Sequence, residues 1–147
     1  MHSQFLNIVF AEIHNRDLSK SDFQLLCVLP GSIFFIVGIV MKYFTPKYPN
    51  LWFGYRTPFS VKNEQTWNEA NSYAANIAIV VGVLNAVVWG YLGYKFSDDP
   101  NNQIVGSIGA PIIIISAAML LILTEIHLRK IFDKDGKRRE GNNGQPM

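Results

Sequence analysis

The sequence is short of charged residues and contains a single cysteine. Asp, Glu, Lys and Arg make up 16% of its 147 residues, whereas soluble domains contain about 25%. This shortage favours an integral membrane protein over a soluble one. Cys27 alone can form neither a disulfide framework nor a cysteine-based metal cluster. The net charge of +2 is too small to indicate a nucleic-acid-binding protein.

Catalytic and cofactor signatures are also missing. The three histidines, His2, His14 and His127, are scattered along the chain, so they form no metal-ligand cluster with Cys27. The sequence has no Gly-rich phosphate loop and no spaced pair of acidic residues on one helix face. We therefore expect a protein that is not an enzyme and that holds neither a metal ion nor a cofactor.

What the sequence does contain is long apolar runs. Three of them, at about residues 23–44, 74–94 and 104–127, have at most one Asp, Glu, Lys or Arg each. A helix rises about 1.5 Å per residue, so each run is long enough to cross a hydrocarbon core of about 30 Å. The sequence thus predicts an all-α integral membrane bundle of three transmembrane helices, whose module covers residues 23–128.

The second run is expected to belong to a longer helix. Asn63 suits the N-cap position, and Glu64 would lie in the first turn, where a negative charge is favoured. Nothing breaks the helical pattern from there to Tyr94. We expect the first turns of this helix to protrude from the bilayer or to lie in the headgroup layer.

Small residues recur at four-residue spacing along the second run, a pattern that lets helix backbones approach closely in lipid. They are Ala74, Ala78, Gly82, Ala86 and Gly90. Asn85 lies near the middle of the same run, where a hydrogen bond to another helix contributes about 0.6 to 2 kcal/mol. We interpret Asn85 as a packing residue, with a ligand contact as the alternative.

The segments outside the module have their own composition. Residues 1–22 are assigned to an extracytoplasmic N-terminal segment, in which apolar residues at helical spacing up to Ile13 suggest a short interfacial helix. Residues 129–147 have few apolar side chains, so we expect a disordered basic tail.

The loop between the first two runs, residues 45–63, is called the motif loop. With the start of the following helix it carries a conspicuous set of residues: Asn50, Gly54, Tyr55, Arg56, Thr57, Pro58, Trp67 and Asn71. This N-x-x-x-G-x-R-T-P pattern followed by a tryptophan resembles the signature of the SdpI family of bacterial membrane proteins. The resemblance implies a three-helix membrane module. It also implies a role in immunity to a secreted peptide toxin, or in holding a repressor at the membrane.

Two interpretations of the motif loop are open. In the first, Gly54 and Pro58 shape a turn in which Arg56 and Thr57 present a forked cation and a hydroxyl to an anionic group of a lipid, peptide or protein. In the second, the aromatic residues are interfacial anchors and Arg56 reaches towards lipid headgroups. The resemblance favours the first interpretation.

Glu125 is a candidate internal partner for Arg56. It is the one acidic residue at the end of the third run, on the side of the membrane where the topology puts the motif loop. The alternative is a local pair with Arg129, one helical turn further on, which contributes about 0.2 to 0.5 kcal/mol.

Basic residues predict the orientation. The motif-loop side, including the tail, has many more lysines and arginines than the opposite side, which carries Arg16, Lys20 and Lys95. The positive-inside rule then puts the motif loop and the C-terminus in the cytoplasm and the N-terminus outside a bacterial plasma membrane.

The function expected from the resemblance is resistance to a toxin peptide, or signal sensing, by binding. Its partners would be the lipid bilayer, a peptide toxin or a cytoplasmic regulator, and a second copy of the chain in a homo-oligomer. Two alternatives stay open. One is a small transport component in which Asn76 and Asn85 line a path through a homo-oligomer, and the other is an accessory subunit of a larger membrane complex.

Overall fold

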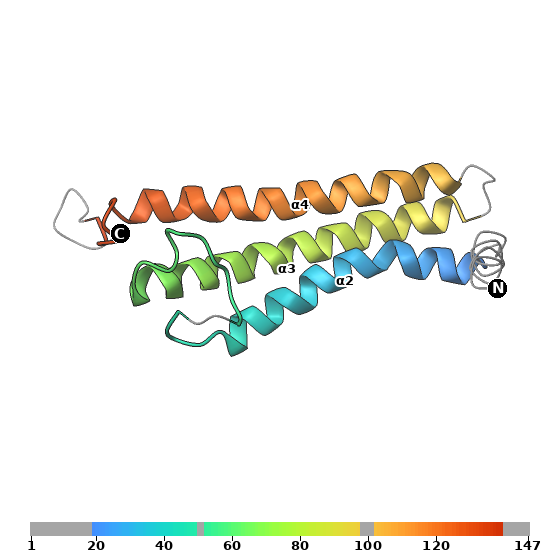
Figure 1. The fold of residues 1–147 in the computed structure, drawn as a ribbon. Helices are drawn as coiled ribbons and strands as arrows, with labels where there is room; N and C mark the ends of the chain where they lie inside the picture. The colour runs from blue at the N-terminus through green and yellow to red at the C-terminus, as the bar shows by residue number, and fades with distance from the viewer. Residues whose placement is uncertain (1–18, 50–51, 98–101, 140–147) are drawn as a thin grey trace, which may run out of the picture.

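The computed structural model describes residues 19–49, 52–97 and 102–139, and within them it contains three long helices (Figure 1). They are α2 (Lys20–Phe44), α3 (Glu64–Lys95) and α4 (Asn102–Ile131). Over the described residues the only β-type pairing is an isolated bridge between Phe132 and Arg138. The prediction of an all-α fold with three membrane-spanning helices is confirmed.

The first two of these helices begin at side-chain caps. Ser19 caps α2 by accepting a hydrogen bond from the backbone nitrogen of Asp22 at 3.2 Å. Asn63 and Thr66 form a reciprocal capping box at the start of α3, which satisfies two backbone N–H groups that have no partner inside the helix. The structure thus begins α3 at the predicted residue and continues it without interruption through the second apolar run.

α2 and α3 pack with their backbones close together. A Cβ added to Gly31 would lie 2.3 Å from the nitrogen of Ala86, and one added to Gly82 would lie 2.4 Å from the nitrogen of Phe35. Since no real side chain fits at these distances, glycine is required on both helices. The small-residue stripe of α3 therefore lies against α2 at Gly82 and Ala86. Ala74 and Ala78 of the stripe are also buried.

α4 lies along α3 but packs against it over far fewer residues, and it barely touches α2. Polar contacts join α3 to α4 along this seam. Within the apolar part, Asn85 Nδ2 donates to Ser116 Oγ at 3.2 Å and to its own helix at Val81 O. Asn85 therefore has the cross-helix contact that its place in the sequence suggested.

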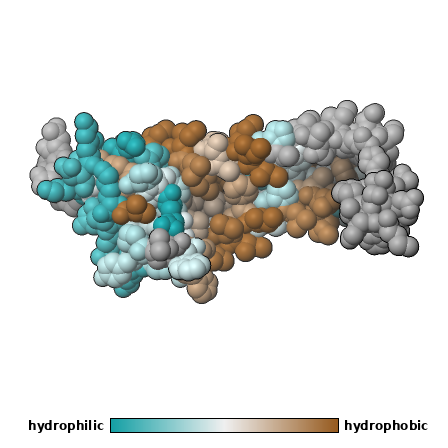
Figure 2. Space-filling model, in the orientation of Figure 1, coloured by the Kyte–Doolittle hydropathy of each residue, from teal (hydrophilic) through white to brown (hydrophobic). Residues whose placement is uncertain are grey.

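The surface of the bundle divides into an apolar length and a polar end. Figure 2 shows brown apolar residues over the middle of the molecule and teal polar residues over the end that carries the motif loop. All three helices are long and apolar enough to cross a membrane, and their largest exposed side chains along this length are aliphatic and aromatic. These surfaces suit contact with lipid chains, as in a multi-pass membrane protein.

The buried core is concentrated at the polar end. It includes Met41 of α2, Tyr55 and Phe59 of the motif loop, and Leu128 and Phe132 at the end of α4. Small residues of α3 complete it. The motif loop is thus a packed part of the protein, which covers one end of the helix pair α3 and α4.

The tail is ordered further than its composition suggested. Residues 132–139, the C-terminal hairpin, turn back at Gly136, whose φ is 80°, and Phe132 is only 2% exposed. Asn63 Nδ2 donates to Gly136 O at 2.8 Å, which ties the hairpin to the start of α3. The expectation of disorder from residue 129 therefore fails as far as Arg139, because one apolar side chain and several backbone contacts hold the segment.

Candidate functional site

Gly54 sets the shape of the motif loop. Its φ of 118° is in the region that side chains other than glycine rarely adopt. A Cβ at this position would lie 2.6 Å from Asn71 Oδ1 and 2.8 Å from Trp67 Cη2. The loop backbone therefore passes directly over two motif residues of α3, and only glycine leaves room for this passage.

Asn71 fixes the loop backbone at this passage. Its Oδ1 accepts a hydrogen bond from the nitrogen of Tyr55 at 2.6 Å, and its Nδ2 donates to Trp67 O at 2.9 Å. Asn71 is 2% exposed, so its amide replaces water as the partner of both backbone groups. Asn71 thus has a structural role that links the loop to α3.

Trp67 lies completely inside this end of the molecule. It is 0% exposed, and its Nε1 donates to Pro46 O at 2.7 Å, which ties the beginning of the loop to α3. Tyr55 is buried as well, at 5% exposure. The interpretation of these two aromatics as interfacial anchors is therefore wrong, because they pack inside the protein, whereas Trp52 is 94% exposed.

Tyr55 also reaches α4. Its hydroxyl donates to Leu121 O at 3.1 Å. Burial, followed by the nearby charge of Glu125, raises the pKa of the Tyr55 phenol to about 12. The phenol is therefore neutral and able to donate this hydrogen bond at physiological pH.

Thr57 forms a second link to α4 and shapes a tight turn. Its Oγ1 donates to Glu125 Oε2 at 3.2 Å. Thr57 and Ser60 also accept hydrogen bonds from each other's backbone nitrogens, at 2.8 and 3.1 Å, through their hydroxyls. Threonine at this position of the motif therefore serves both the turn and the contact between the loop and α4.

Glu125 lies between the motif loop and the last turns of α4. Its Oε1 accepts a hydrogen bond from Arg129 Nη2 at 2.6 Å, so the local pair offered as the alternative partner is present. Arg56 is exposed, and its pairing with Glu125 stays a prediction. Pro58 is exposed, and Asn50 lies outside the described residues.

Three residues of this region were not singled out in the sequence. Ser60 and Thr66 are buried and make the turn and cap contacts described above. The spacing T-x-x-S and N-x-x-T is a local signal that points to such reciprocal bonds. Phe59 gives no comparable signal, because an apolar residue in a loop is equally compatible with a buried core position and with a membrane contact.

A further polar contact between α3 and α4 involves His127. Its ring stacks on Tyr73, with centroids 3.7 Å apart, and its Nε2 lies 2.9 Å from Glu69 Oε1. Together with the bond from Asn85 to Ser116, these contacts link α3 to α4 at two levels along the bundle. Among the described residues, no group of three or more His, Cys, Asp or Glu side chains could hold a metal ion.

Three apolar helices with a folded polar cap at one end define this chain as a small multi-pass integral membrane protein. Comparison with known proteins refines this class. The model of the SdpI/YfhL protein family matches residues 47–126, more than half of the chain, and the chain belongs to this family. It is an SdpI-like bacterial membrane protein.

The similarity to one relative covers more of the chain than the family model does. The protein named "Uncharacterized protein YfhL" of Bacillus subtilis (strain 168) is 33% identical over 112 residues, which cover 76% of this chain and 93% of that protein. No solved structure matches the chain. The segment matched by the family model contains the motif loop from residue 47, all of α3, and α4 as far as Ile126.

Proposed function

We propose that this protein acts by binding, as a membrane protein of toxin-peptide immunity or signal sensing. A peptide or lipid ligand contacts the bundle within the membrane and alters how α4 lies against α3. The motif loop then changes what it presents to a cytoplasmic regulator. Membership of the SdpI/YfhL family supports this proposal.

The observation that carries the proposal is how the motif loop bridges two helices. Asn71 and Trp67 bind the loop to α3, whereas Tyr55 and Thr57 bind it to α4 at Leu121 and Glu125. α2 and α3 pack closely, but α4 touches α3 over few residues. A small movement of α4 therefore strains or breaks the loop contacts, while the α2 to α3 pair stays unchanged.

A protection assay tests the proposal. The full chain is expressed in a sensitive Gram-positive host that is challenged with a panel of purified secreted antimicrobial peptides. We expect the chain to raise the inhibitory concentration of at least one peptide. Thr57→Val should remove this protection while the protein still accumulates in the membrane, because it breaks the contact with Glu125.

Val61→Ala is the matched control, since Val61 is an exposed residue of the same loop. It should protect as well as the unaltered chain. The proposal of immunity is wrong if the chain protects against none of the peptides. The role of the loop is wrong if Thr57→Val protects fully.

The proposal includes an orientation with the motif loop in the cytoplasm, which the excess of lysine and arginine on that side supports. In a Cys27→Ser background, an impermeant thiol reagent should label Lys95→Cys on intact cells. It should label Val61→Cys only after permeabilisation. Labelling of Val61→Cys on intact cells contradicts this orientation.

A further inference from the structure

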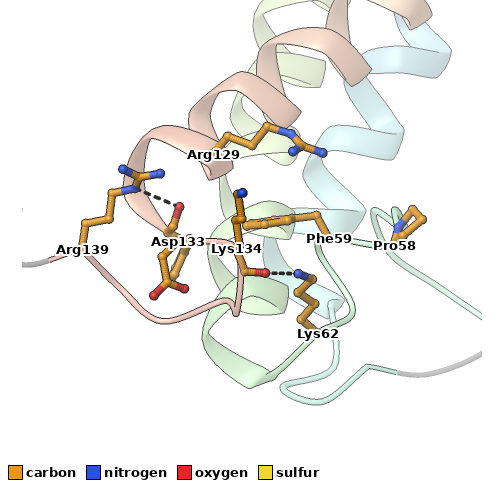
Figure 3. Close-up of a pocket in the computed structure, with 8 residues that line it drawn as sticks. Pro58, Phe59, Lys62, Arg129, Asp133, Lys134 and Arg139 are labelled. Carbon is orange, nitrogen blue, oxygen red and sulfur yellow. Dashed lines mark hydrogen bonds between the residues drawn. The ribbon is translucent and has the colours of Figure 1, made fainter.

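A pocket of about 570 Å³ lies between the motif loop, the end of α4 and the C-terminal hairpin. Figure 3 shows the residues from these three segments around it. Its volume is within the range of roughly 300 to 1,000 Å³ that small-molecule sites occupy. The pocket therefore has the size of a ligand site. The C-terminal hairpin forms one of its walls.

Among the described residues, four cationic side chains line the pocket. Lys62 comes from the motif loop, Arg129 from α4, and Lys134 and Arg139 from the hairpin. Lys62 is far in the sequence from the other three, which lie within residues 129–139. Such a concentration of positive charge at one place favours an anionic ligand.

Asp133 is the one carboxylate that lines the pocket among the described residues, so it offsets one of these four positive charges. Its Oδ1 accepts hydrogen bonds from the nitrogens of Asp135 at 2.9 Å and Lys137 at 2.8 Å. The bond from Lys137 in particular holds the pKa of this carboxyl below its usual value. The carboxylate thus remains ionised and is committed to the hairpin backbone.

The backbone carbonyls around the pocket have donors as well. Arg139 donates from its backbone nitrogen to Ile131 O at 2.8 Å and from Nε to Phe132 O at 3.1 Å, and Lys62 donates to Lys134 O. Carbonyls at the C-terminal end of a helix normally repel anions. Here cationic residues cap them, which removes part of that repulsion.

An aromatic ring forms part of the pocket wall. The guanidinium carbon of Arg129 lies 5.3 Å from the centre of the Phe59 ring and Lys62 Nζ lies 4.9 Å from it, and in Figure 3 they are on either side of the ring. These cation–π contacts hold both side chains in place. Arg129 uses one donor for Glu125 among the described residues, and a guanidinium has five.

We propose that this pocket binds a phosphate group, the chemical group shared by anionic phospholipid headgroups and soluble phosphate esters. Arg129, Lys134 and Arg139 supply charged donors, and forked guanidinium groups match the oxygens of phosphate. Lys62 positions Lys134 through its backbone carbonyl. The pocket adjoins the last turns of α4, where the candidate span ends at Ile131, so a lipid phosphate lies within reach. The site does not depend on the immunity proposal.

Binding to purified full-length protein in a neutral detergent tests the site. Phosphatidylglycerol and inorganic phosphate are titrated separately, with bound ligand counted by native mass spectrometry and stability followed by thermal unfolding. We expect Arg129→Gln/Lys134→Gln to bind about tenfold more weakly than the unaltered chain, as the loss of two cations near a phosphate implies.

The matched control is Lys130→Gln/Lys137→Gln. It removes the same two charges from the same two segments, but neither residue lines the pocket, so it should bind as the unaltered chain does. Lys134→Gln alone changes one exposed side chain and serves if the double variant fails to fold. It should also weaken binding.

The two titrations identify the source of the phosphate. Stronger binding of phosphatidylglycerol than of inorganic phosphate at equal concentration indicates a lipid site, and the reverse order indicates a soluble ester. The proposal is overturned if neither ligand binds. It is equally overturned if the pocket variants and the control variant lose the same affinity, since the effect would then be one of net charge.

Discussion

The side-chain oxygen of Asn71 lies 2.6 Å from the backbone nitrogen of Tyr55. This contact joins the helix after the motif loop to the middle of the loop itself. Because both groups are buried, neither can exchange its partner for water. The contacts of Asn71 with the loop therefore explain why an asparagine stands at this position, without any ligand.

Replacing Asn71 by alanine should destabilise the protein by about 1 to 3 kcal/mol, since a buried N–H group would lose its partner. Thermal unfolding in detergent, followed by tryptophan fluorescence, measures the change. Asn68→Ala is the control, because Asn68 is exposed on the same helix. An equal effect of both substitutions would show that the contact with Tyr55 contributes nothing particular.

Gly54→Ala should be destabilising by about 1 to 3 kcal/mol, because alanine is strained at positive φ and its Cβ meets Asn71. Gly109→Ala should instead stabilise the protein. A Cβ at Gly109 has no neighbour within 4 Å, and alanine in a helix is favoured over glycine by about 0.5 to 1 kcal/mol. Unfolding midpoints that move in the same direction for both variants would contradict this comparison.

The α2 to α3 contact should be sensitive to one methyl group. Gly82→Ala puts a Cβ 2.4 Å from Phe35 N, and overpacking of this kind costs about 1 to 3 kcal/mol. At Gly90 the nearest atom is Val28 Cγ2 at 3.4 Å, so Gly90→Ala should be tolerated. The fraction of each variant that stays monodisperse on gel filtration after heating distinguishes them.

Alkaline pH should release the motif loop from α4. The pKa of Tyr55 is raised from 10.0 to about 12, so the folded protein holds this proton more tightly than the unfolded chain. Its contribution to stability is complete below pH 10 and is lost as the pH rises to about 12. Stability measured over this interval should fall less steeply in Tyr55→Phe. Identical slopes would refute the assignment.

The pairing of Arg56 with Glu125 has its own test. Arg56→Glu and Glu125→Arg should each reduce stability, and the double exchange should recover part of the loss if the two side chains interact. Glu125 also binds Thr57 and Arg129, so recovery is expected to be incomplete. No recovery at all would exclude the pair.

Local patterns in the sequence were sufficient for the helices. The apolar runs predict the three spans, and the cap at Asn63 predicts where α3 begins, because both depend on residues that are neighbours in the chain. The small residues of α3 likewise indicate a close helix contact. Gly31 on α2 is the partner of Gly82 and Ala86, and it did not enter the prediction.

The sequence indicated where the candidate site lies but not which contacts hold it together. The pattern marks Tyr55 and Trp67, yet an aromatic residue beside a membrane span suits an interface and a core equally well. Their partners, Leu121 and Pro46, are backbone carbonyls, which leave no trace in the sequence. The sequence did not predict the C-terminal hairpin, because a segment with few apolar residues is normally disordered. The burial of Phe132 depends on residues that are distant in the sequence.

The bridging contacts of the motif loop constrain the order in which the protein matures. Tyr55 and Thr57 bind atoms that lie 66 and 68 residues later in the chain, so the ribosome releases the loop long before its partners exist. The loop can complete its fold only after α4 has been inserted. A nascent chain arrested before Leu121 would therefore present an unfinished loop to proteases and chaperones.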